Sequence, residues 1–169
     1  MKIIQYNLVT IDGYVTDKEG KEDIFPQDLF EQYLILCERF GCVIMGGTTY
    51  DTLQSWNIKD KRFLKTQKII ISAKEIVTSD DIQRVSSPDD AINKAREFGF
   101  ENVLLCSGQT INTLFLKKNL IDEIILCIYS VVVGQGCSLY KENILTNFSI
   151  KKVEMINLKS VMIFYEKNK

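Results

Sequence analysis

Short apolar runs recur along the chain, separated by glycines and by groups of polar residues. Runs of this length, rich in isoleucine and valine, are typical of buried β-strands. The pattern predicts strands at residues 2–9, 42–45, 68–72, 82–85, 102–106 and 124–133, and a terminal antiparallel hairpin of residues 148–156 and 161–165. The run at 124–133 is too long and too apolar for a strand at the edge of a sheet.

Between these runs, apolar residues recur at helical spacing. The spacing predicts a long helix from Pro26 until Gly41, a short helix after Gly47, and helices over residues 88–98 and 111–118. Ser87 suits the N-cap of the third helix because a proline and two acids follow it. The order of elements predicts an α/β sandwich with a mainly parallel central sheet and an antiparallel edge.

Two strand-to-helix junctions combine glycine with hydroxyl groups: GGTT at residues 46–49 and SGQT at 107–110. Both follow apolar strands, whose carboxyl ends form the edge where open α/β sheets bind ligands. The first N–H groups of a helix attract phosphate oxygens, and glycine lets a ligand approach the backbone. A single junction is also typical of an ordinary turn in which Thr48 or Thr49 caps the helix. Two such junctions favour a phosphate site.

The composition fits one globular domain over residues 1–169. The net charge is −1, so no basic field would recruit nucleic acid or an anionic membrane. No apolar run approaches the ~20 residues of a transmembrane helix, and the chain begins with a strand-like segment rather than a signal peptide. We therefore expect a cytoplasmic protein that binds neither nucleic acid nor membrane.

One local excess of positive charge lies at residues 59–68, where four lysines and an arginine accompany a single acid, Asp60. Such a cluster either helps to hold a phosphorylated ligand or is a solvated connecting segment. The sequence leaves both interpretations open.

The chemistry available to the chain is restricted, because it contains no histidine. His-based triads and the usual zinc sites are therefore excluded, and we predict no metal site. The five cysteines include no Cys-x-x-Cys pair, and three lie in apolar runs, so we expect reduced thiols in the core. Catalysis would depend on carboxylates, hydroxyls, lysines, thiols or a bound cofactor.

Five motifs, in order across nearly the whole chain, resemble the dihydrofolate reductase-like superfamily, in the branch of the reductase domain of riboflavin biosynthesis. They are TIDG at residues 10–13, VIMGGTTYD at 43–51, SGQT at 107–110, LIDEI at 120–124 and IYSVVVGQG at 128–136. The second is similar to the family's apolar-G-R-x-T-[YW]-[ED] motif, and the last to its P-[IV]-x-x-G-x-G segment. Each motif is short, but their common order makes the resemblance specific.

The resemblance implies a sheet of about eight strands, a homodimer, and NADPH bound across the strand ends, with NADH not excluded. The implied reaction is hydride transfer to a C=N or C=O group of a small heterocyclic or sugar-derived substrate. The cofactor-binding residues that it implies are Asp12, Gly13 and Tyr14 near the nicotinamide, Gly46, Gly47, Thr48 and Thr49 at the pyrophosphate, Ser72 toward the adenosine, and Ser107, Gly108, Gln109 and Thr110 across the pyrophosphate.

The candidate proton donor is Asp28. Residues 25–30 (FPQDLF) resemble the P-x-D-L segment of folate reductases, whose acid anchors the pterin ring. A carboxylate facing an apolar cleft there could bind the amidine-like edge of a pterin or pyrimidine, and burial would raise its pKa, which favours proton relay. The alternative is a solvated acid in the first turn of a helix.

The chain departs from the family pattern at three positions. Gly47 stands where the family has an arginine, which removes a cation expected near the 2′-phosphate of NADPH. Ser130 replaces a proline, and Ser107 replaces the first glycine of a G-G turn. The cations that could substitute for the missing arginine are Lys61, Arg62 and Lys74.

Two functions are compatible with these residues. The first is an NADPH-dependent reductase of a small nitrogen heterocycle: a pterin, dihydrofolate or a pyrimidine-like compound of the riboflavin pathway. Because the cofactor supplies the hydride, this function suits a chain without histidine. The alternative is a nucleotide-binding or assembly protein of the same fold that has lost reductase activity, which Gly47 and Ser130 favour.

Overall fold

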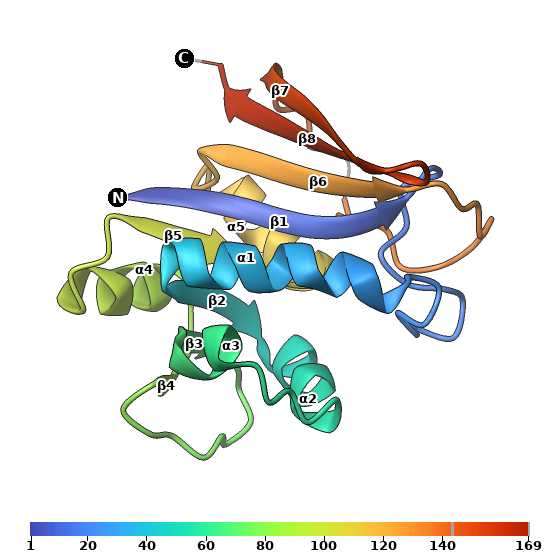
Figure 1. Cartoon of the computed structure of the whole chain (residues 1–169). Helices are drawn as coiled ribbons and strands as arrows, with labels where there is room; N and C mark the ends of the chain where they lie inside the picture. The colour runs from blue at the N-terminus through green and yellow to red at the C-terminus, as the bar shows by residue number, and fades with distance from the viewer. Residues whose placement is uncertain (143, 169) are drawn as a thin grey trace.

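An eight-stranded sheet lies between two layers of helices in the computed structural model, which describes residues 1–142 and 144–168 (Figure 1). The strands are β1 (Lys2–Thr10), β2 (Cys42–Gly46), β3 (Gln67–Ile71), β4 (Ile82–Val85), β5 (Asn102–Leu105), β6 (Glu123–Tyr129), β7 (Phe148–Asn157) and β8 (Ser160–Lys167). The helices are the 3-10 turn η1 (Gln27–Leu29), α1 (Phe30–Phe40), α2 (Gly47–Ser55), α3 (Lys61–Lys65), α4 (Pro88–Glu97) and α5 (Gln109–Lys117).

The strand order is β4-β3-β2-β5-β1-β6-β8-β7. The strands from β4 to β6 are parallel, whereas β8 is antiparallel to both β6 and β7. The predicted α/β sandwich, with a mainly parallel sheet of eight strands and a C-terminal antiparallel hairpin, is confirmed. β7 forms one edge of the sheet and exposes Ile150, Val153 and Met155; the expected homodimer stays a prediction.

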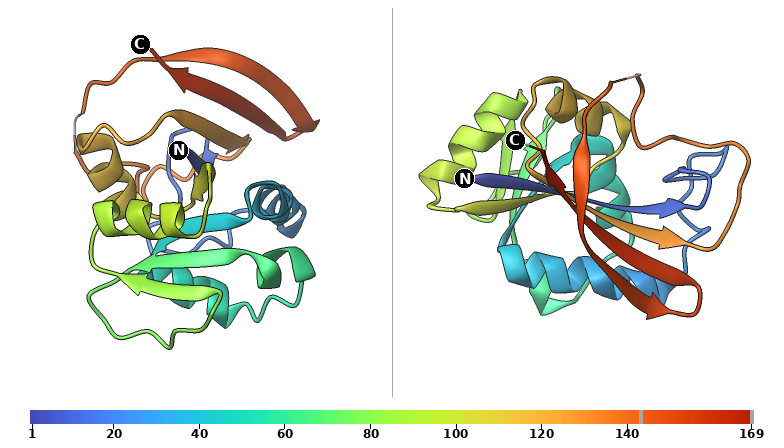
Figure 2. Two further views of the ribbon diagram at one scale, coloured as in Figure 1. Left: turned by 90° about the vertical axis from the view of Figure 1, so that its left-hand side faces the viewer. Right: turned by 90° about the horizontal axis from the view of Figure 1, so that it is seen from above.

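The sheet has a core on each face, because successive side chains of a strand point to opposite sides. In β2, Val43 and Met45 pack with residues of α1 and α3, while Cys42 and Ile44 pack with residues of α4 and α5. Figure 2 shows the two helical layers on either side of the sheet. The near-continuous apolar runs of the sequence reflect this burial on both faces.

The predicted helix termini are partly confirmed. Ser87 caps α4 as expected, with its hydroxyl accepting a hydrogen bond from the Asp90 amide at 3.1 Å. The long helix also ends as predicted, at Gly41, whose φ of 66° suits glycine. Its first turn, however, is the 3-10 turn η1, which Pro26 precedes.

The prediction of a strand over residues 124–133 is too long, because β6 ends at Tyr129. Tyr129 pairs with Thr10 on one side and Ser160 on the other, which are the last and first residues of their strands. Beyond this point no neighbouring strand can satisfy the backbone, and the Ser130 amide instead donates to the carbonyl of Lys159 at 2.8 Å.

All five cysteines are free, and Cys37, Cys42 and Cys127 are buried, as predicted. Burial raises the pKa of the Cys42 thiol to about 12, so this thiol stays protonated and chemically inert at neutral pH. In the part of the chain that the structure describes, no helix has the length and apolar character needed to cross a bilayer.

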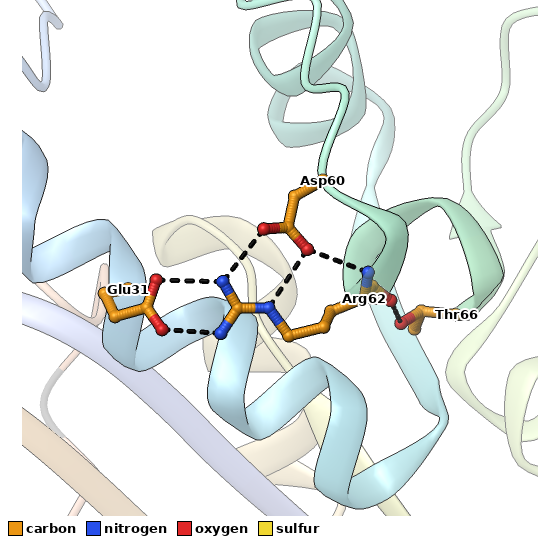
Figure 3. A network of polar contacts seen from close by, with 4 residues as sticks. All are labelled: Glu31, Asp60, Arg62 and Thr66. Carbon is orange, nitrogen blue, oxygen red and sulfur yellow. Dashed lines mark hydrogen bonds and ion pairs between the residues drawn. The ribbon is translucent and has the colours of Figure 1, made fainter.

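The basic segment 59–68 is largely structural. Arg62 joins α3 to α1 through a two-pronged contact with Glu31, and it also bonds Asp60, the N-cap of α3 (Figure 3). Hydrogen bonds from Arg62 lower the pKa of the Asp60 carboxyl to about 2. Lys68 is only 3% exposed, and its ammonium donates to the carbonyl oxygens of Phe63 and Thr66 at 2.8 and 2.7 Å.

Replacing Lys68 by methionine should lower the free energy of unfolding by about 1–3 kcal/mol. Methionine keeps an apolar stem but removes the ammonium that donates to the carbonyls of Phe63 and Thr66. Urea unfolding would measure the loss. The control is Lys65→Met at an exposed position of α3, expected to change stability by less than about 0.5 kcal/mol. Equal effects of the two substitutions would contradict this role for Lys68.

Candidate functional site

A cleft of about 1310 Å³ lies at the carboxyl ends of the central parallel strands, between the turns after β2, β3 and β5 and the first turns of α1. Its volume exceeds the ~300–1,000 Å³ of ordinary small-molecule pockets, which leaves room for two ligands side by side. Nine of the residues expected to bind a cofactor line it: Gly46, Gly47, Thr48, Thr49, Ser72, Ser107, Gly108, Gln109 and Thr110.

The helices α2 and α5 begin at this cleft with glycine caps. Gly46 precedes α2 and Gly108 precedes α5, and neither helix has a side-chain cap. By contrast, α3 and α4 are capped by the side chains of Asp60 and Ser87. The first-turn N–H groups of α2 and α5 therefore lack a side-chain acceptor and sit at the positive ends of two helix dipoles, an arrangement that attracts an anion.

Of the two interpretations of Thr48 and Thr49, the structure does not support the helix cap, because neither threonine caps α2. The helix starts at Gly47, two residues earlier than a Thr48 cap would require, and both threonines lie within its first turn. Gly46 occupies the N-cap position, and its extended backbone, with ψ at 160°, has the conformation that is typical of an N-cap residue.

A hydrogen bond joins the two glycine turns directly. The Gly46 amide donates to the Ser107 hydroxyl at 3.0 Å, and both groups are buried. The contact is tight: a Cβ on Gly46 would lie 2.9 Å from Cγ1 of Ile111 and 3.2 Å from Oγ of Ser107. Ser107, a departure from the family's glycine, thus supplies the acceptor that ties the turn after β2 to the turn after β5.

Buried amides hold the second turn from behind. The side-chain amides of Asn7 and Asn112 both donate to the Ser107 carbonyl, at 2.8 and 2.9 Å. Oδ1 of Asn7 in turn accepts hydrogen bonds from the side-chain amides of Gln5 and Asn112, both at 3.0 Å. Gln5 and Asn112 are fully buried. This network was not predicted from the sequence, although the two amides Gln5 and Asn7 inside the apolar run 2–9 were a signal for it.

The space around Gly47 explains the absence of the family's arginine. A Cβ at Gly47 would lie 2.9 Å from Oγ and 3.2 Å from Cβ of Ser72, so a larger side chain would displace the serine. The Ser72 hydroxyl instead bonds the backbone of Lys74, accepting from its amide at 3.0 Å and donating to its carbonyl at 3.1 Å. This places Lys74 on the cleft wall.

Of the proposed substitute cations, only Lys74 lines the cleft. Lys61 is absent from the lining, and Arg62 is engaged by Glu31 and Asp60. Lys59 is a further amine on the cleft wall, contributed by the basic segment.

The residues expected near the nicotinamide, Asp12, Gly13 and Tyr14, lie outside the cleft lining. The carboxylate of Asp12 accepts hydrogen bonds from the Thr10 hydroxyl and the Gly134 amide, at 2.6 and 2.8 Å. These bonds, the Thr10 contact foremost, lower the pKa of the Asp12 carboxyl. Asp12 ties the end of β1 to the loop after β6, and the following residues of the chain, Val15 and Thr16, reach the cleft instead.

Asp28 also lies outside the cleft lining. Its side chain is exposed, and its carboxylate accepts a hydrogen bond from Asn157 at the end of β7 at 3.5 Å. The geometry matches the solvated first-turn acid rather than the proton donor. The acids that do line the cleft from this region are Glu22 and Asp23, six and five residues earlier in the chain.

Apolar and aromatic side chains line the half of the cleft beyond the two turns. The Phe30 ring meets the rings of Tyr33 and Trp56, with centroids 5.4 and 5.6 Å apart. Tyr33 is 4% exposed and stacks on Tyr6 in the strand beneath it. Such a wall suits a flat, partly apolar ring.

Comparisons with known proteins agree with this architecture. The model of the RibD C-terminal domain family matches residues 1–163. The uncharacterized protein YyaP of Bacillus subtilis (strain 168) is 25% identical over 171 residues, which cover 95% of this chain and 86% of that protein. These matches confirm the resemblance to the riboflavin-pathway branch of the dihydrofolate reductase-like superfamily.

Solved structures share the fold. A candidate riboflavin biosynthesis protein of Shewanella sp. PV-4 is 24% identical, with a TM-score of 0.84 and full coverage of both chains. The diaminohydroxyphosphoribosylaminopyrimidine deaminase/5-amino-6-(5-phosphoribosylamino)uracil reductase of Thermotoga maritima is 14% identical, with a TM-score of 0.75. The matched region covers 99% of this chain but only 56% of the Thermotoga chain, so this chain spans little more than half of that protein.

The contact between the two turns can be tested with alanine at their glycine caps. Gly46→Ala forces Ile111 and Ser107 to move, so we expect it to lower the free energy of unfolding by about 1–3 kcal/mol more than Gly108→Ala. A Cβ on Gly108 would meet nothing within 4 Å, and both substitutions carry the same cost of replacing a glycine cap. Urea unfolding would compare the two variants. Equal losses would contradict the tight contact at Gly46.

Proposed function

Because the chain belongs to the RibD C-terminal domain family, we propose that it is an NADPH-dependent reductase acting on a small nitrogen heterocycle. The observation that supports this most strongly is the pair of glycine-capped helices, α2 and α5, that begin at one cleft without side-chain caps. Two first turns at one cleft suit a pyrophosphate, whose two phosphate groups each carry negative charge on their oxygens.

The residues of the cleft fit such a cofactor. The amides that follow Gly46 and Gly108 would hold the pyrophosphate, and Ser72 and Lys74 line the cleft at the end of β3, toward the adenosine. The Lys74 ammonium would meet the 2′-phosphate that distinguishes NADPH from NADH. When bound, the cofactor supplies a hydride, so the protein itself must orient the substrate and deliver a proton.

The wall around Phe30, Tyr33 and Trp56 would hold the substrate ring. A flat heterocycle packs against aromatic side chains, and enclosure by such walls excludes water from the reacting bond. This half of the cleft adjoins the turns after β2 and β5, so cofactor and substrate would lie side by side. The relatives named as a reductase and as a candidate riboflavin biosynthesis protein favour a pterin- or pyrimidine-like ring.

The alternative function, nucleotide binding without reduction, loses part of its support. Gly47 is explained by the position of Ser72, and Lys74 offers a cation where the family's arginine is missing.

Titration of the protein with NADPH, followed by cofactor fluorescence, tests the binding step. Oxidation of NADPH is then followed at 340 nm, a property of the cofactor itself, with a panel of pterins, dihydrofolate and aminopyrimidines.

We expect micromolar to submillimolar binding of NADPH and faster oxidation with at least one member of the panel. Absence of NADPH binding at millimolar concentration would contradict the proposal. Binding without accelerated oxidation by any compound would favour the alternative function.

The role of Lys74 gives a separate prediction. Lys74→Gln should raise the Kd for NADPH about tenfold, because a charge-assisted contact to phosphate is lost. The Kd for NADH should stay within about twofold, since NADH has no 2′-phosphate. Lys61→Gln, a lysine of α3 outside the cleft lining, is the matched control. If Lys74→Gln weakened the binding of NADPH and NADH equally, Lys74 would not be the residue that recognises the 2′-phosphate.

A further inference from the structure

The C-terminal hairpin carries an exposed apolar surface. The pairing of β7 with β8 sets apolar residues directly opposite each other three times, and such partners point to the same side of a sheet. The pairs are Ile150 with Tyr165, Val153 with Ile163, and Met155 with Val161. Their β7 members are 63%, 54% and 69% exposed, and their β8 members are half-buried. These six side chains form the hairpin face.

The polar residues of β7 point to the opposite side. Lys152 pairs with Phe164 and Glu154 with Met162, and both β8 partners pack into the core beside α1. Lys152 and Glu154 contact each other and line a separate polar depression together with Arg39. A strand face that meets water normally carries polar residues. The apolar composition of the hairpin face therefore indicates that another surface covers it.

The single chain exposes enough surface for an interface of ordinary size. It exposes 9366 Å², whereas a compact monomer of its 19.4 kDa mass exposes about 8,500 Å². The excess of roughly 900 Å² is close to the ~800 Å² that each partner buries in a standard interface. The β7–β8 hairpin adds to this surface because it stands at one edge of the sheet, apart from the helical layers (Figure 1).

The hairpin face suits a second copy of this chain. Its three pairs contain no charged side chain that would select a foreign partner, and homodimer interfaces are more apolar than other interfaces. The face is also complementary to itself. A two-fold axis that crosses the strands at Val153 lays the bulky end, which carries Tyr165, over the smaller end of the other copy, which carries Val161.

The edge of β7 is less suitable for contact than the face. The register of β7 against β8 shifts between Ile150 and Lys152 and again between Met155 and Asn157. Lys151 and Lys152 add two adjacent charges to this edge. Bulges and lysines are features by which natural sheets prevent edge-to-edge pairing. Two copies should therefore meet through their faces.

We propose that the chain forms a homodimer in which the hairpin faces of two copies stack across a two-fold axis at Val153. The two sheets lie about 10 Å apart, and Val153 of each copy meets its counterpart in the other. The described residues that line the cleft all precede β7 in the chain, so both clefts stay open. The dimer is thus independent of the proposed reductase function.

The first test places a charge at the axis. Sedimentation velocity between roughly 1 and 100 µM should show the native protein as a dimer. Val153→Glu should raise the dimer Kd about a hundredfold or more, because two carboxylates would be buried together. Val77→Glu, the same change at an 89% exposed valine between β3 and β4, should leave the Kd within about twofold. Thermal unfolding checks that the variants are folded.

A charge swap tests the position of the axis. Val153→Lys alone should weaken the dimer as Val153→Glu does, but an equimolar mixture of the two variants should form a heterodimer, because opposite charges then meet. Met155→Glu repeats the first test at a second exposed position of the hairpin face, so a folding defect in one variant leaves the other to decide. A monomeric native protein at about 100 µM, a native Kd in the folded glutamate variants, or a mixture that stays monomeric would each overturn the proposal.

Discussion

One hydrogen bond, from the Gly46 amide to the Ser107 hydroxyl, joins the two turns on which the candidate site depends. It links residues 61 positions apart, at the ends of the adjacent parallel strands β2 and β5. A side chain on Gly46 would collide with Ile111, and the Ser107 carbonyl is held by two buried asparagines. The spacing between the first turns of α2 and α5 is therefore fixed by the protein before any ligand binds, which lowers the entropy cost of binding.

The other walls of the cleft are arranged around these two fixed turns. With a glycine at position 47, Ser72 can approach α2 and hold the backbone of Lys74 on the cleft wall. The buried Lys68 and the paired Arg62 fix α3 against the sheet and α1, on the side where Phe30 and Trp56 form the aromatic wall. The anion-binding backbone and the cation thus come from the ends of three strands, β2, β5 and β3, as is usual for open α/β sheets, while α1 and the end of α2 supply the apolar wall.

Much of the fold was predictable, because β-branched runs buried on both faces and helices with one apolar face carry strong sequence patterns. The apolar pattern predicted the end of β6 wrongly, because a strand also needs a neighbouring strand to pair with. Val131 and Val132 continue the apolar run, but the described residues beside them form no strand. The two glycine turns were predictable as a pair. The hydrogen bond between them was not, since nothing local in the sequence reports a contact between residues 46 and 107.

The positions of the acidic side chains were likewise not predictable from the sequence. Asp28 matches a family segment, yet the first turn of the helix carries it toward β7 and solvent, while the irregular loop before it brings Glu22 to the cleft. Periodicity says nothing about the path of such a loop, so only the structure distinguishes the two carboxylates. Asp12 likewise fits its motif but serves to join two loops.

The central claim is that the first turns of α2 and α5 form one anion site, and amide NMR tests it most directly. During titration with NADP⁺, the amides of residues 47–49 and 109–111 should shift together along one saturable binding curve, while those of the side-chain-capped first turn of α4 stay unchanged. Shifts confined to one of the two helices, or shared equally by α4, would contradict the account.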